Sequence, residues 1–487
     1  MTNARDEAGF IARMLASGGD SRITVRAGGN TNIYGASPFP RETLAYSAST
    51  ANDISVDAFA HLRQLVASWP AGALLSPLAY AGHLDRLRAR IRAAYGLPDD
   101  IGIVFAPSGT DLEYVALSLV RSRAGRPVTN LLLGADEVGS GCILSAAGRL
   151  FAPETALGAA CVKGEAVGGL EDTRIAALPV RDGQGAAVDP DMIEGALDRA
   201  VEAAAAEGRH LLAHVVHGSK TGLILPTLAA LDRLRLRHGD RVSFVVDACQ
   251  ARISGARIRD YLARDAIVLL TGSKFMGGPP FSGIALIPRH FAAERPLAAG
   301  LAALCRRAEW PSDWSGLDHL AVEPNPGLLL RLEAAVFELE RFSALSAARC
   351  EAVISRFDAA CTQLTNAIGA RRVRGEIASS LLESATLATL DLTTLPGTPD
   401  LAAAQCWHRA LAARGIRLGQ PVKCVRLSDG RWGGTLRISL SMPRIVSLAA
   451  LDGDAIAVRL AGDMARIEQV LRAATRPISA SGQRKIS

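Results

Sequence analysis

The chain has 487 residues, of which 49% are hydrophobic and 21% charged, so it is long enough for more than one domain and too apolar for a disordered protein. Its formal net charge of +6 is spread thinly, and no run of Lys and Arg marks a nucleic-acid-binding surface. The sequence shows no signal-peptide core and no apolar run of membrane-spanning length, and its eight cysteines include no C-x-x-C pair. We therefore expect a cytoplasmic protein with reduced thiols that uses no metal and binds neither nucleic acid nor membrane.

The first sixty residues differ in pattern from the rest of the chain. The stretch 26–41 is rich in Gly, Asn and Pro, so we expect residues 1–60 to form an ordered but irregular segment, with helical structure over 56–96 after it. Short apolar runs then alternate with helical patterns, and the predicted strands span residues 101–106, 128–134, 210–218, 242–248, 266–272 and 283–288. Continuous apolar strands that alternate with helices are typical of a largely parallel sheet covered on both faces, so we predict an α/β fold.

The last third of the chain changes character again. A long helical segment covers residues 327–364, and a mixed unit comes after it. That unit comprises a strand at 386–392, a helix at 401–414 and a strand at 435–441. We expect a large domain over 61–330 and a smaller α+β domain over 331–475, preceded by the segment 1–60 and succeeded by a flexible tail at 476–487.

Four predicted strand ends carry polar or glycine-rich residues, and ligands of open α/β sheets bind at the carboxyl ends of the strands. The first is Ser108-Gly109-Thr110, at a turn that leads into a helix. Exposed backbone amides at a helix N-terminus, with hydroxyl groups beside them, suit an anion, although an ordinary helix cap has the same pattern. The second is Asp247, a carboxylate at the end of an apolar strand, which needs a cation or strong donors to meet it. Gln250 is close enough along the chain to reach the same ligand.

The third strand end is a Thr-Gly-Ser-Lys turn that places Lys274 among apolar and glycine-rich neighbours, between the hydroxyls of Thr271 and Ser273 and the next strand. A buried lysine can form a Schiff base with an aldehyde. A surface lysine fits this place poorly, because only five of the 54 basic residues are lysines. The fourth is Arg437, inside a strand of the C-terminal unit, which suits either a bidentate carboxylate ligand or an interdomain salt bridge.

Together, D-A-C-Q at 247–250, T-G-S-K at 271–274 and G-G-P-P-F-S-G at 277–283 resemble the fold-type I pyridoxal-phosphate (PLP) enzymes, in particular the class V aminotransferase and cysteine desulfurase branch. The resemblance keeps the order of elements over roughly residues 60–450. It implies a large domain with a mainly parallel, seven-stranded-type sheet, a smaller α+β domain, PLP as cofactor and a homodimer. It also implies that Lys274 forms the Schiff base and acts as general acid and base, and that Asp247 keeps the pyridine nitrogen protonated.

The resemblance assigns further roles to residues of this chain. Arg437 would bind the α-carboxylate of the substrate, and Gln250 or Ser219 would contact the phenolic oxygen of the cofactor. The residues it places around the cofactor are Ser108, Gly109, Thr110, Glu137, Ser219, Asp247, Gln250, Thr271, Ser273 and Lys274, of which Gly109, Thr110, Thr271 and Ser273 would bind the phosphate.

The sequence also departs from the pattern of this branch. Ser219 or Lys220 stands where an Asn is usual, and the region expected to stack on the cofactor ring offers Glu137, Val138 and Ser140 in place of an aromatic residue or a His. Cys424, placed 13 residues before Arg437, is either a nucleophile or an inert buried thiol.

Three further residues have two interpretations each. Asn32 and Tyr34 either line the mouth of the substrate site or belong to a packed loop, and Arg444 either binds a second acidic group of the substrate or is a surface arginine.

The predicted activity is a PLP-dependent reaction at the Cα amino group of an amino acid. We favour an aminotransferase, and the alternative is an α,β- or γ-eliminating lyase, a desulfurase or a related enzyme that forms C–C bonds. A P-loop protein is excluded because Ser219, not Gly, precedes Lys220, and a dinucleotide oxidoreductase lacks its G-x-G-x-x-G. A non-catalytic regulator on the same fold usually carries a DNA-binding domain, and residues 1–60 show no basic helix-turn-helix.

Overall fold

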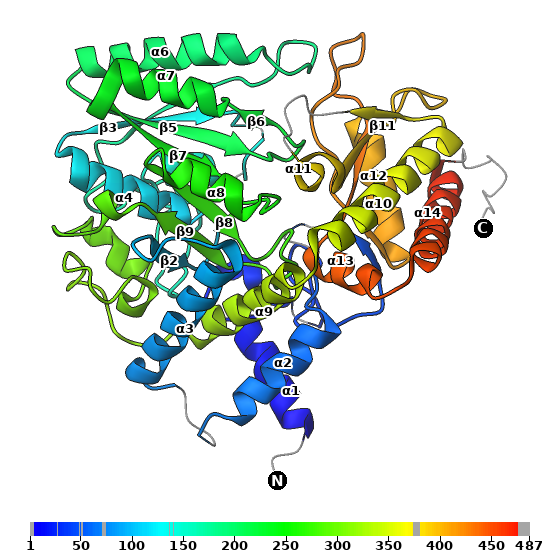
Figure 1. Ribbon diagram of the computed structural model, residues 1–487, viewed down its shortest axis with the longest axis horizontal. Coiled ribbons are helices and arrows are strands. Elements are labelled where there is room, and N and C mark those ends of the chain that lie inside the picture. The colour runs from blue at the N-terminus through cyan, green and yellow to red at the C-terminus, as the bar shows by residue number, and fades with distance from the viewer. Residues whose placement is uncertain are drawn as a thin grey trace, which may run out of the picture.

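The computed structural model describes residues 4–26, 28–47, 49, 52–70, 75–135, 137–139, 141–373 and 380–475. A large domain built around a mainly parallel sheet lies beside a smaller domain of helices and antiparallel strands (Figure 1). This arrangement confirms the predicted α/β fold class. The predicted tail at 476–487 lies outside the described residues.

The described part of the large domain holds an eight-stranded sheet with the strand order β2-β9-β8-β7-β5-β3-β4, and β6 pairs with β5. Strand β9 runs antiparallel to β2 and β8, whereas β8, β7, β5, β3 and β4 run parallel to one another. The six predicted strands match β2, β3, β5, β7, β8 and β9, each to within one residue at either end. The strands are β2 (Gly102–Ala106), β3 (Val128–Leu133), β4 (Arg174–Leu178), β5 (His210–His217), β6 (Ile224–Leu225), β7 (Val242–Asp247), β8 (Ala266–Thr271) and β9 (Gly283–Ile287).

Helices cover both faces of this sheet because successive strand residues point to opposite sides. Phe244 and Val246 of β7 belong to one core cluster with α3, α6, α7 and α8, while Val245 between them belongs to another with α4. The helices of the large domain are α3 (Pro77–Tyr95), α4 (Leu112–Ala124), α5 (Cys142–Ala146), α6 (Pro190–Ala206), α7 (Leu228–His238) and α8 (Gly255–Leu262). Short 3-10 helices occur at Ser21–Ile23, Gly239–Arg241, Arg289–Phe291, Ala299–Ala303 and Arg307–Glu309.

The N-terminal segment is more regular than predicted. It contains helix α1 (Ala4–Leu15), strand β1 (Leu44–Tyr46) and the start of α2 (Val56–Ala67). Ile11 and Leu62 pack with Leu330 in a small core of their own, so α1 and α2 form only where α9 gives them an apolar surface. Strand β1 pairs with β12 of the C-terminal domain, a partner that the local sequence does not reveal. The predicted helical stretch 56–96 is two helices, α2 and α3.

The smaller domain contains a three-stranded antiparallel sheet with the order β10-β11-β13, which confirms the predicted α+β unit. The predicted long helix is divided at Ser346, whose side chain caps the start of α10 by accepting a hydrogen bond from the Arg349 amide. The predicted boundary at residue 330 falls inside α9, the helix against which α1, α2, α3 and α13 pack. The elements are α9 (Pro326–Ser343), α10 (Ala347–Ile368), β10 (Arg371–Val373), α11 (Leu381–Ala385), β11 (Leu387–Asp391), α12 (Leu401–Ala413), β12 (Ile416–Leu418), β13 (Thr435–Ser439), α13 (Met442–Ala449) and α14 (Gly453–Thr475).

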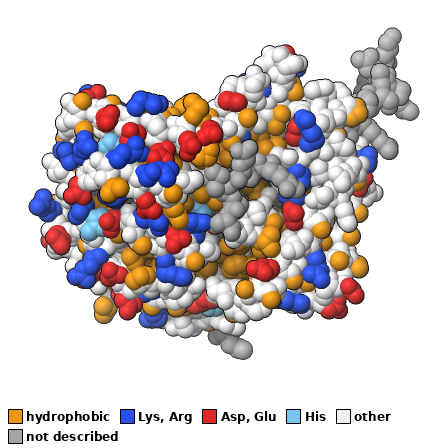
Figure 2. All heavy atoms as spheres, turned by 45° about the horizontal axis from the view of Figure 1, so that its top comes forward, with side chains coloured by type: hydrophobic (Ala, Val, Ile, Leu, Met, Phe, Trp, Pro, Cys, Tyr) orange, Lys and Arg blue, Asp and Glu red, His pale blue; other side chains and the backbone are white. Residues whose placement is uncertain are grey.

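On the face of the molecule drawn in Figure 2, Lys and Arg side chains are interspersed with Asp and Glu over the large domain. This distribution agrees with the thinly spread charge of the sequence. Within the described residues, no helix combines the length and the hydropathy that a bilayer crossing needs.

Candidate active site

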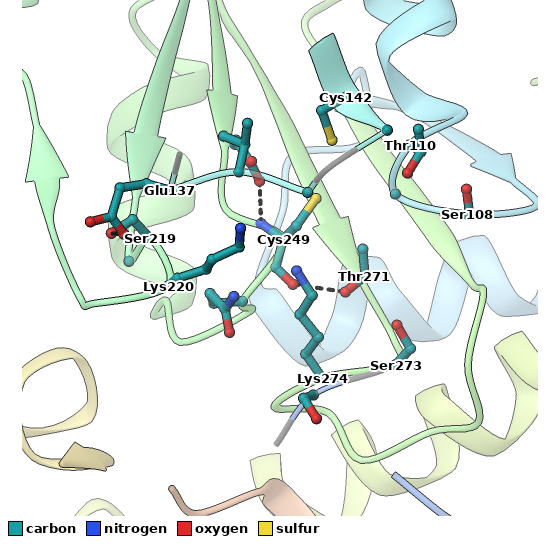
Figure 3. A pocket seen from close by; sticks show the side chains of 18 of the residues that line it. Ser108, Thr110, Glu137, Cys142, Ser219, Lys220, Cys249, Thr271, Ser273 and Lys274 are labelled. Atoms are coloured by element: carbon teal, nitrogen blue, oxygen red, sulfur yellow. Dashed lines mark hydrogen bonds between the residues drawn. The ribbon is translucent and has the colours of Figure 1, made fainter. Parts of the chain in front are cut away.

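A cavity of about 330 Å³ lies at the carboxyl ends of the parallel strands, closed on one side by the smaller domain. It is the place that the strand-end rule predicts for a ligand. Lysine, carboxylate, hydroxyl and glycine residues from separate strands meet there (Figure 3). The predicted site residues that line it are Tyr34, Ser108, Gly109, Thr110, Glu137, Ser219, Asp247, Gln250, Thr271, Ser273, Lys274 and Arg437.

The turn between β2 and α4 forms a cradle at the N-terminus of α4. A side chain could not be added at Gly109, because a Cβ there would lie 2.6 Å from a methyl carbon of Thr271. Ser108 donates its hydroxyl hydrogen to Asp111, and Thr271 donates to the Cys249 carbonyl at 2.7 Å. Asp111, not Ser108, occupies the cap position of α4, and its side chain caps no backbone amide. The cradle therefore offers backbone amides and the Thr110 side chain to an anion.

Asp247 ends β7 and is held by its own chain, since its carboxylate accepts a hydrogen bond from the Cys249 amide at 2.9 Å. Beneath it, on the α4 side of the sheet, the imidazole of His214 contacts the carboxylate of Glu113 at 2.8 Å, and both side chains are fully buried. Burial acts to lower the pKa of His214, but the carboxylates of Glu113 and Asp247 more than offset it and raise that pKa to about 9. The imidazolium thus adds a positive charge under Asp247.

Sequence reasoning missed the Glu113–His214 pair. The two residues are 101 positions apart. The available signal was local: a Glu in the first turn of a helix that is buried along almost its whole length, and a His in the middle of a fully buried strand. Such polar residues on apolar elements need a partner, although the sequence does not say which.

We expect the pH dependence of the unfolding free energy to reveal the Glu113–His214 ion pair. Since the pKa of His214 is raised from 6.5 to about 9, its stabilising contribution is complete below about pH 6.5 and is lost as the pH rises through about 9. The difference in unfolding free energy between wild type and His214→Gln should therefore shrink over that range, by up to about 3 kcal/mol. Urea unfolding at a series of pH values measures it.

His210 on the same strand is the matched control. Burial lowers the pKa of His210 to about 4, and its ring contacts the Ser243 hydroxyl at 2.9 Å. It is neutral in the folded protein, so the effect of His210→Gln on stability should stay constant between pH 6.5 and 9. An equal pH slope in both variants would contradict the assigned ion pair.

Lys274 lies in the turn that follows β8, and its neighbours fix its backbone there. The Asn52 side chain donates to the Lys274 carbonyl at 2.8 Å, and the amide of Phe275 donates to the Gln250 carbonyl at 3.3 Å. Phe275 and Met276 are completely buried, so they anchor the turn in the core. With the backbone fixed in this way, the Lys274 side chain extends into the cavity (Figure 3).

The carboxylate of Glu137 is directed away from Lys274 (Figure 3). It accepts hydrogen bonds from Ser219 and Thr221 at 2.9 Å and forms an ion pair with Arg181 at 2.8 Å. Glu137 therefore lines the cavity without presenting its carboxylate for stacking, and the Ser219 hydroxyl hydrogen is committed to it. The side chains and backbone that face the cavity beyond Glu137 are those of Val138, Gly139, Gly141 and Cys142, while Ser140 lies outside the described residues.

Lys220 enters the same cavity from the loop after β5, with its amino group on the side of Lys274 (Figure 3). Burial lowers the pKa of the Lys220 ammonium, and the positive charges of Lys274 and Arg437 lower it further. The sequence indicated Lys220 or Ser219 for the position of the usual Asn, and the structure adds that Lys220 is the second lysine of the site.

Gln250 lines the same cavity. Its side-chain oxygen accepts a hydrogen bond from Arg252 at 3.0 Å, which leaves the amide hydrogens of Gln250 for a ligand.

Arg437 of β13 brings the smaller domain into the site. Its guanidinium donates to the carbonyls of Gln420, at 2.8 Å, and Lys220, at 3.0 Å. Burial lowers the pKa of Arg437 to about 10, which leaves it charged at neutral pH. In the part of the chain that the structure describes, no carboxylate forms a salt bridge with Arg437. The interdomain salt bridge, the alternative interpretation of Arg437, is therefore not found there, and the guanidinium is available to a carboxylate ligand.

The N-terminal segment reaches the mouth of the cavity through Tyr34 and Arg22, and Arg22 was not predicted. Arg22 is held by Asp20 through two hydrogen bonds of 2.7 Å and lies over the rings of Phe151 and Phe281. Asn32 does not line the cavity. Its side-chain oxygen accepts hydrogen bonds from the Tyr34 and Ala36 amides, so its place is that of a loop-forming residue.

Two other residues lie away from the cavity. Arg444 contacts the Tyr46 hydroxyl at 3.0 Å and forms an ion pair with Asp463. It therefore has a structural role and is neither the ligand of a substrate carboxylate nor an arginine of the open surface. Cys424 is buried, and burial raises the pKa of its thiol to about 11. This agrees with the inert interpretation of Cys424, because a nucleophile needs a thiolate.

No protein-family profile and no curated protein matches the sequence. Solved structures match the fold. A cysteine desulfurase from Thermococcus onnurineus NA1 is 16% identical, with 89% of this chain and 95% of that chain covered and a TM-score of 0.56. A ureidoglycine–glyoxylate aminotransferase from Bacillus subtilis is 16% identical, with 89% and 99% covered and a TM-score of 0.54. A serine palmitoyltransferase from S. paucimobilis with bound PLP and myriocin is 14% identical, with 89% and 87% covered and a TM-score of 0.52.

These likenesses confirm the predicted fold, that of the fold-type I PLP enzymes. The matches run over nearly the whole of each chain, so both domains take part in the likeness.

Proposed function

We propose that the protein is a PLP-dependent enzyme that acts at the Cα amino group of an amino acid, and that it is an aminotransferase. One observation carries the proposal. Asp247 and Lys274 come from the ends of the neighbouring parallel strands β7 and β8 and meet in one cavity with Arg437, a guanidinium without a carboxylate partner among the described residues. Such chemistry requires three groups of the protein: a cation that binds the substrate carboxylate, an amine that reacts with the cofactor aldehyde and a carboxylate that faces the pyridinium.

The cavity fits the cofactor on structural grounds. The α4 N-terminus, with Thr110 and the close approach of Gly109 to Thr271, would hold the phosphate. Asp247 would hold the pyridine nitrogen, and its carboxylate lies above the buried imidazole of His214. Lys274 would hold the aldehyde carbon. Bound PLP would supply an electron sink for the charge that develops at Cα.

The chain's own residues then perform defined tasks. Arg437 binds the substrate α-carboxylate and fixes which bond of Cα faces the cavity. Lys274 removes the proton from Cα and returns it, because its side chain is the flexible base that enters beside Asp247. Asp247 would face the pyridine nitrogen of bound PLP with its carboxylate.

An eliminating lyase is the second candidate, and Lys220 is the observation that favours it. Its ammonium lies in the same cavity, and burial together with the charges of Lys274 and Arg437 lowers its pKa, so it is a candidate donor of a proton to a leaving group. Product analysis separates the two reactions: a ketoacid with a cofactor left in the amine form indicates transamination, and free ammonia indicates elimination.

Borohydride trapping tests the proposal. Purified protein incubated with PLP should turn yellow, and reduction with subsequent peptide mass mapping should place a pyridoxyl group on Lys274 and not on Lys220. Addition of substrate amino acids before reduction should prevent the label. Absence of a visible band after incubation, or a label spread over surface amines, would refute the cofactor assignment.

We also propose a homodimer in the cytoplasm. Enzymes of this fold commonly complete their active sites at a dimer interface, and all eight cysteines are free thiols, as expected of a reducing compartment. Sedimentation velocity measures the oligomeric state.

A further inference from the structure

A second cavity of about 370 Å³ adjoins the first. It lies between the loop after β3 and the smaller domain, where Leu401 and Gln405 of α12 and residues 420–423 form its wall. The two cavities share five residues, and Arg437 is the one that reaches both domains' walls through its hydrogen bonds to Gln420 and Lys220. The residues common to both are Glu137, Val138, Lys220, Gln420 and Arg437.

The second cavity is cationic. Lys220, Lys423 and Arg437 line it, and its single carboxylate among the described lining residues, that of Glu137, is already paired with Arg181 at 2.8 Å. Lysine is rare in this protein: the chain has five, and three of them line the joined cavities. No salt bridge joins Lys423 to a carboxylate of the described residues.

The positions of the charged residues in the two cavities indicate the direction in which the side chain of a bound amino acid would extend. Lys274 lines only the first cavity, Arg437 stands at the junction, and Lys423 lines the second. An amino acid with its amino group at Lys274 and its α-carboxylate at Arg437 would therefore extend its side chain toward Lys423. The opposite route, through the mouth, meets Arg22, whose charge is matched by Asp20 and which lies among aromatic rings. Among the described residues that line the mouth, Arg22 therefore offers an anion no unmatched positive charge.

The positive charges of the joined cavities repel one another. The lowered pKa of Lys220 is the mark of this repulsion, since Lys274 and Arg437 contribute to it after burial itself. A bound anion would relieve this repulsion.

We propose that the second cavity is the subsite for a second anionic group, a carboxylate or a phosphate, on the side chain of the amino-acid substrate, and that Lys423 and Lys220 bind it. The proposal rests on the proposed function for the identity of the substrate as an amino acid. Gln405 and Gln420 place amide groups in the same cavity, which can complete the hydrogen bonds of such a group.

The test compares isosteric ligands on the PLP-loaded protein. Spectral titrations with L-glutamate against L-glutamine, and with O-phospho-L-serine against L-serine, measure the preference for the anionic member of each pair. We expect apparent affinity about tenfold higher for the anionic member, as one charged hydrogen bond provides. The first pair reports a carboxylate and the second a phosphate, and preference in either pair supports the proposal.

Lys423→Met should remove about tenfold of that preference, whereas Lys163→Met, at an exposed lysine that lines neither cavity, should keep it. Equal affinity within both pairs, or a preference that survives Lys423→Met, would overturn the subsite.

Calorimetry distinguishes a wrong assignment of the subsite from a wrong proposed function. Glutarate, which carries two carboxylates, should bind the protein more tightly than butyrate, which carries one. These ligands carry no amino group, so their binding does not depend on amino-acid chemistry. If no amino acid changes the spectrum but glutarate binds and loses affinity in Lys423→Met, the subsite stands and the proposed reaction falls.

Discussion

Replacement of Lys274 by alanine is expected to lower amino-acid turnover by about 10⁴-fold, because the variant loses the base that moves the Cα proton. The turn itself should survive, since its anchors are the hydrogen bond from the Asn52 side chain to the Lys274 carbonyl and the buried Phe275 and Met276 rather than the lysine side chain. Stopped-flow absorbance with a substrate amino acid measures the rate, and circular dichroism checks the fold. Lys163→Ala, an exposed lysine outside the cavity, is the control.

Small amines should distinguish a missing base from a damaged site. The alanine leaves space where the Lys274 side chain entered the cavity, so methylamine is expected to restore part of the rate in proportion to its concentration. Asp247→Asn also lowers the rate, but it leaves no space that an amine can fill, and methylamine should not rescue it. Turnover that persists at the wild-type rate in Lys274→Ala would move the catalytic role elsewhere, with Lys220 the neighbour to examine.

Much of the large domain could be predicted because its strands are buried on both faces. A run such as 266–271 reads as strand without knowledge of any partner, and it is buried at every position. The proximity of Asp247 and Lys274 was then predictable, because neighbouring parallel strands bring their carboxyl ends together whatever the rest of the chain does. Strand β4 was not, because it lies at the sheet edge with four of its five residues exposed and lacks a continuous apolar pattern.

The parts that could not be predicted depend on tertiary contacts between distant segments. Glu137 was expected near the cofactor ring, but Arg181, 44 residues away, and Thr221, 84 residues away, draw its carboxylate aside. Arg22 and strand β1 reach their places only because α1 and α2 pack on α9 and β1 pairs with β12. Local spacing carries no information on such partners.

The N-terminal segment thus supplies Arg22, Tyr34 and Ser49 to the lining of the cavity, and one buried arginine fixes the segment to the core. Arg331 of α9 is 0% exposed and donates hydrogen bonds to the carbonyls of Phe281, at 2.7 Å, and Gly18, at 2.8 Å. It also donates to the carbonyls of Ser17 and Leu15. Because these acceptors come from the end of α1 and from the strip beside Lys274, a single guanidinium ties the segment to the wall of the site.

Arg331→Leu is therefore expected to lower the unfolding free energy by about 3–5 kcal/mol, since four carbonyls lose a charged donor in a place that water does not reach. Arg331→Lys should recover only part of this, because one ammonium cannot span acceptors that the planar guanidinium reaches from three nitrogens. Urea unfolding measures both, and Arg459→Leu, a half-exposed arginine paired with Asp463 at 3.3 Å, should cost less than about 1 kcal/mol. Limited proteolysis adds a local measure: cleavage between α1 and β1 should become faster in Arg331→Leu than in Arg459→Leu. If the two leucine variants unfold alike, the segment is held by the apolar contacts of α1 and α2 with α9, and Arg331 is not what places Arg22 and Tyr34 at the mouth of the cavity.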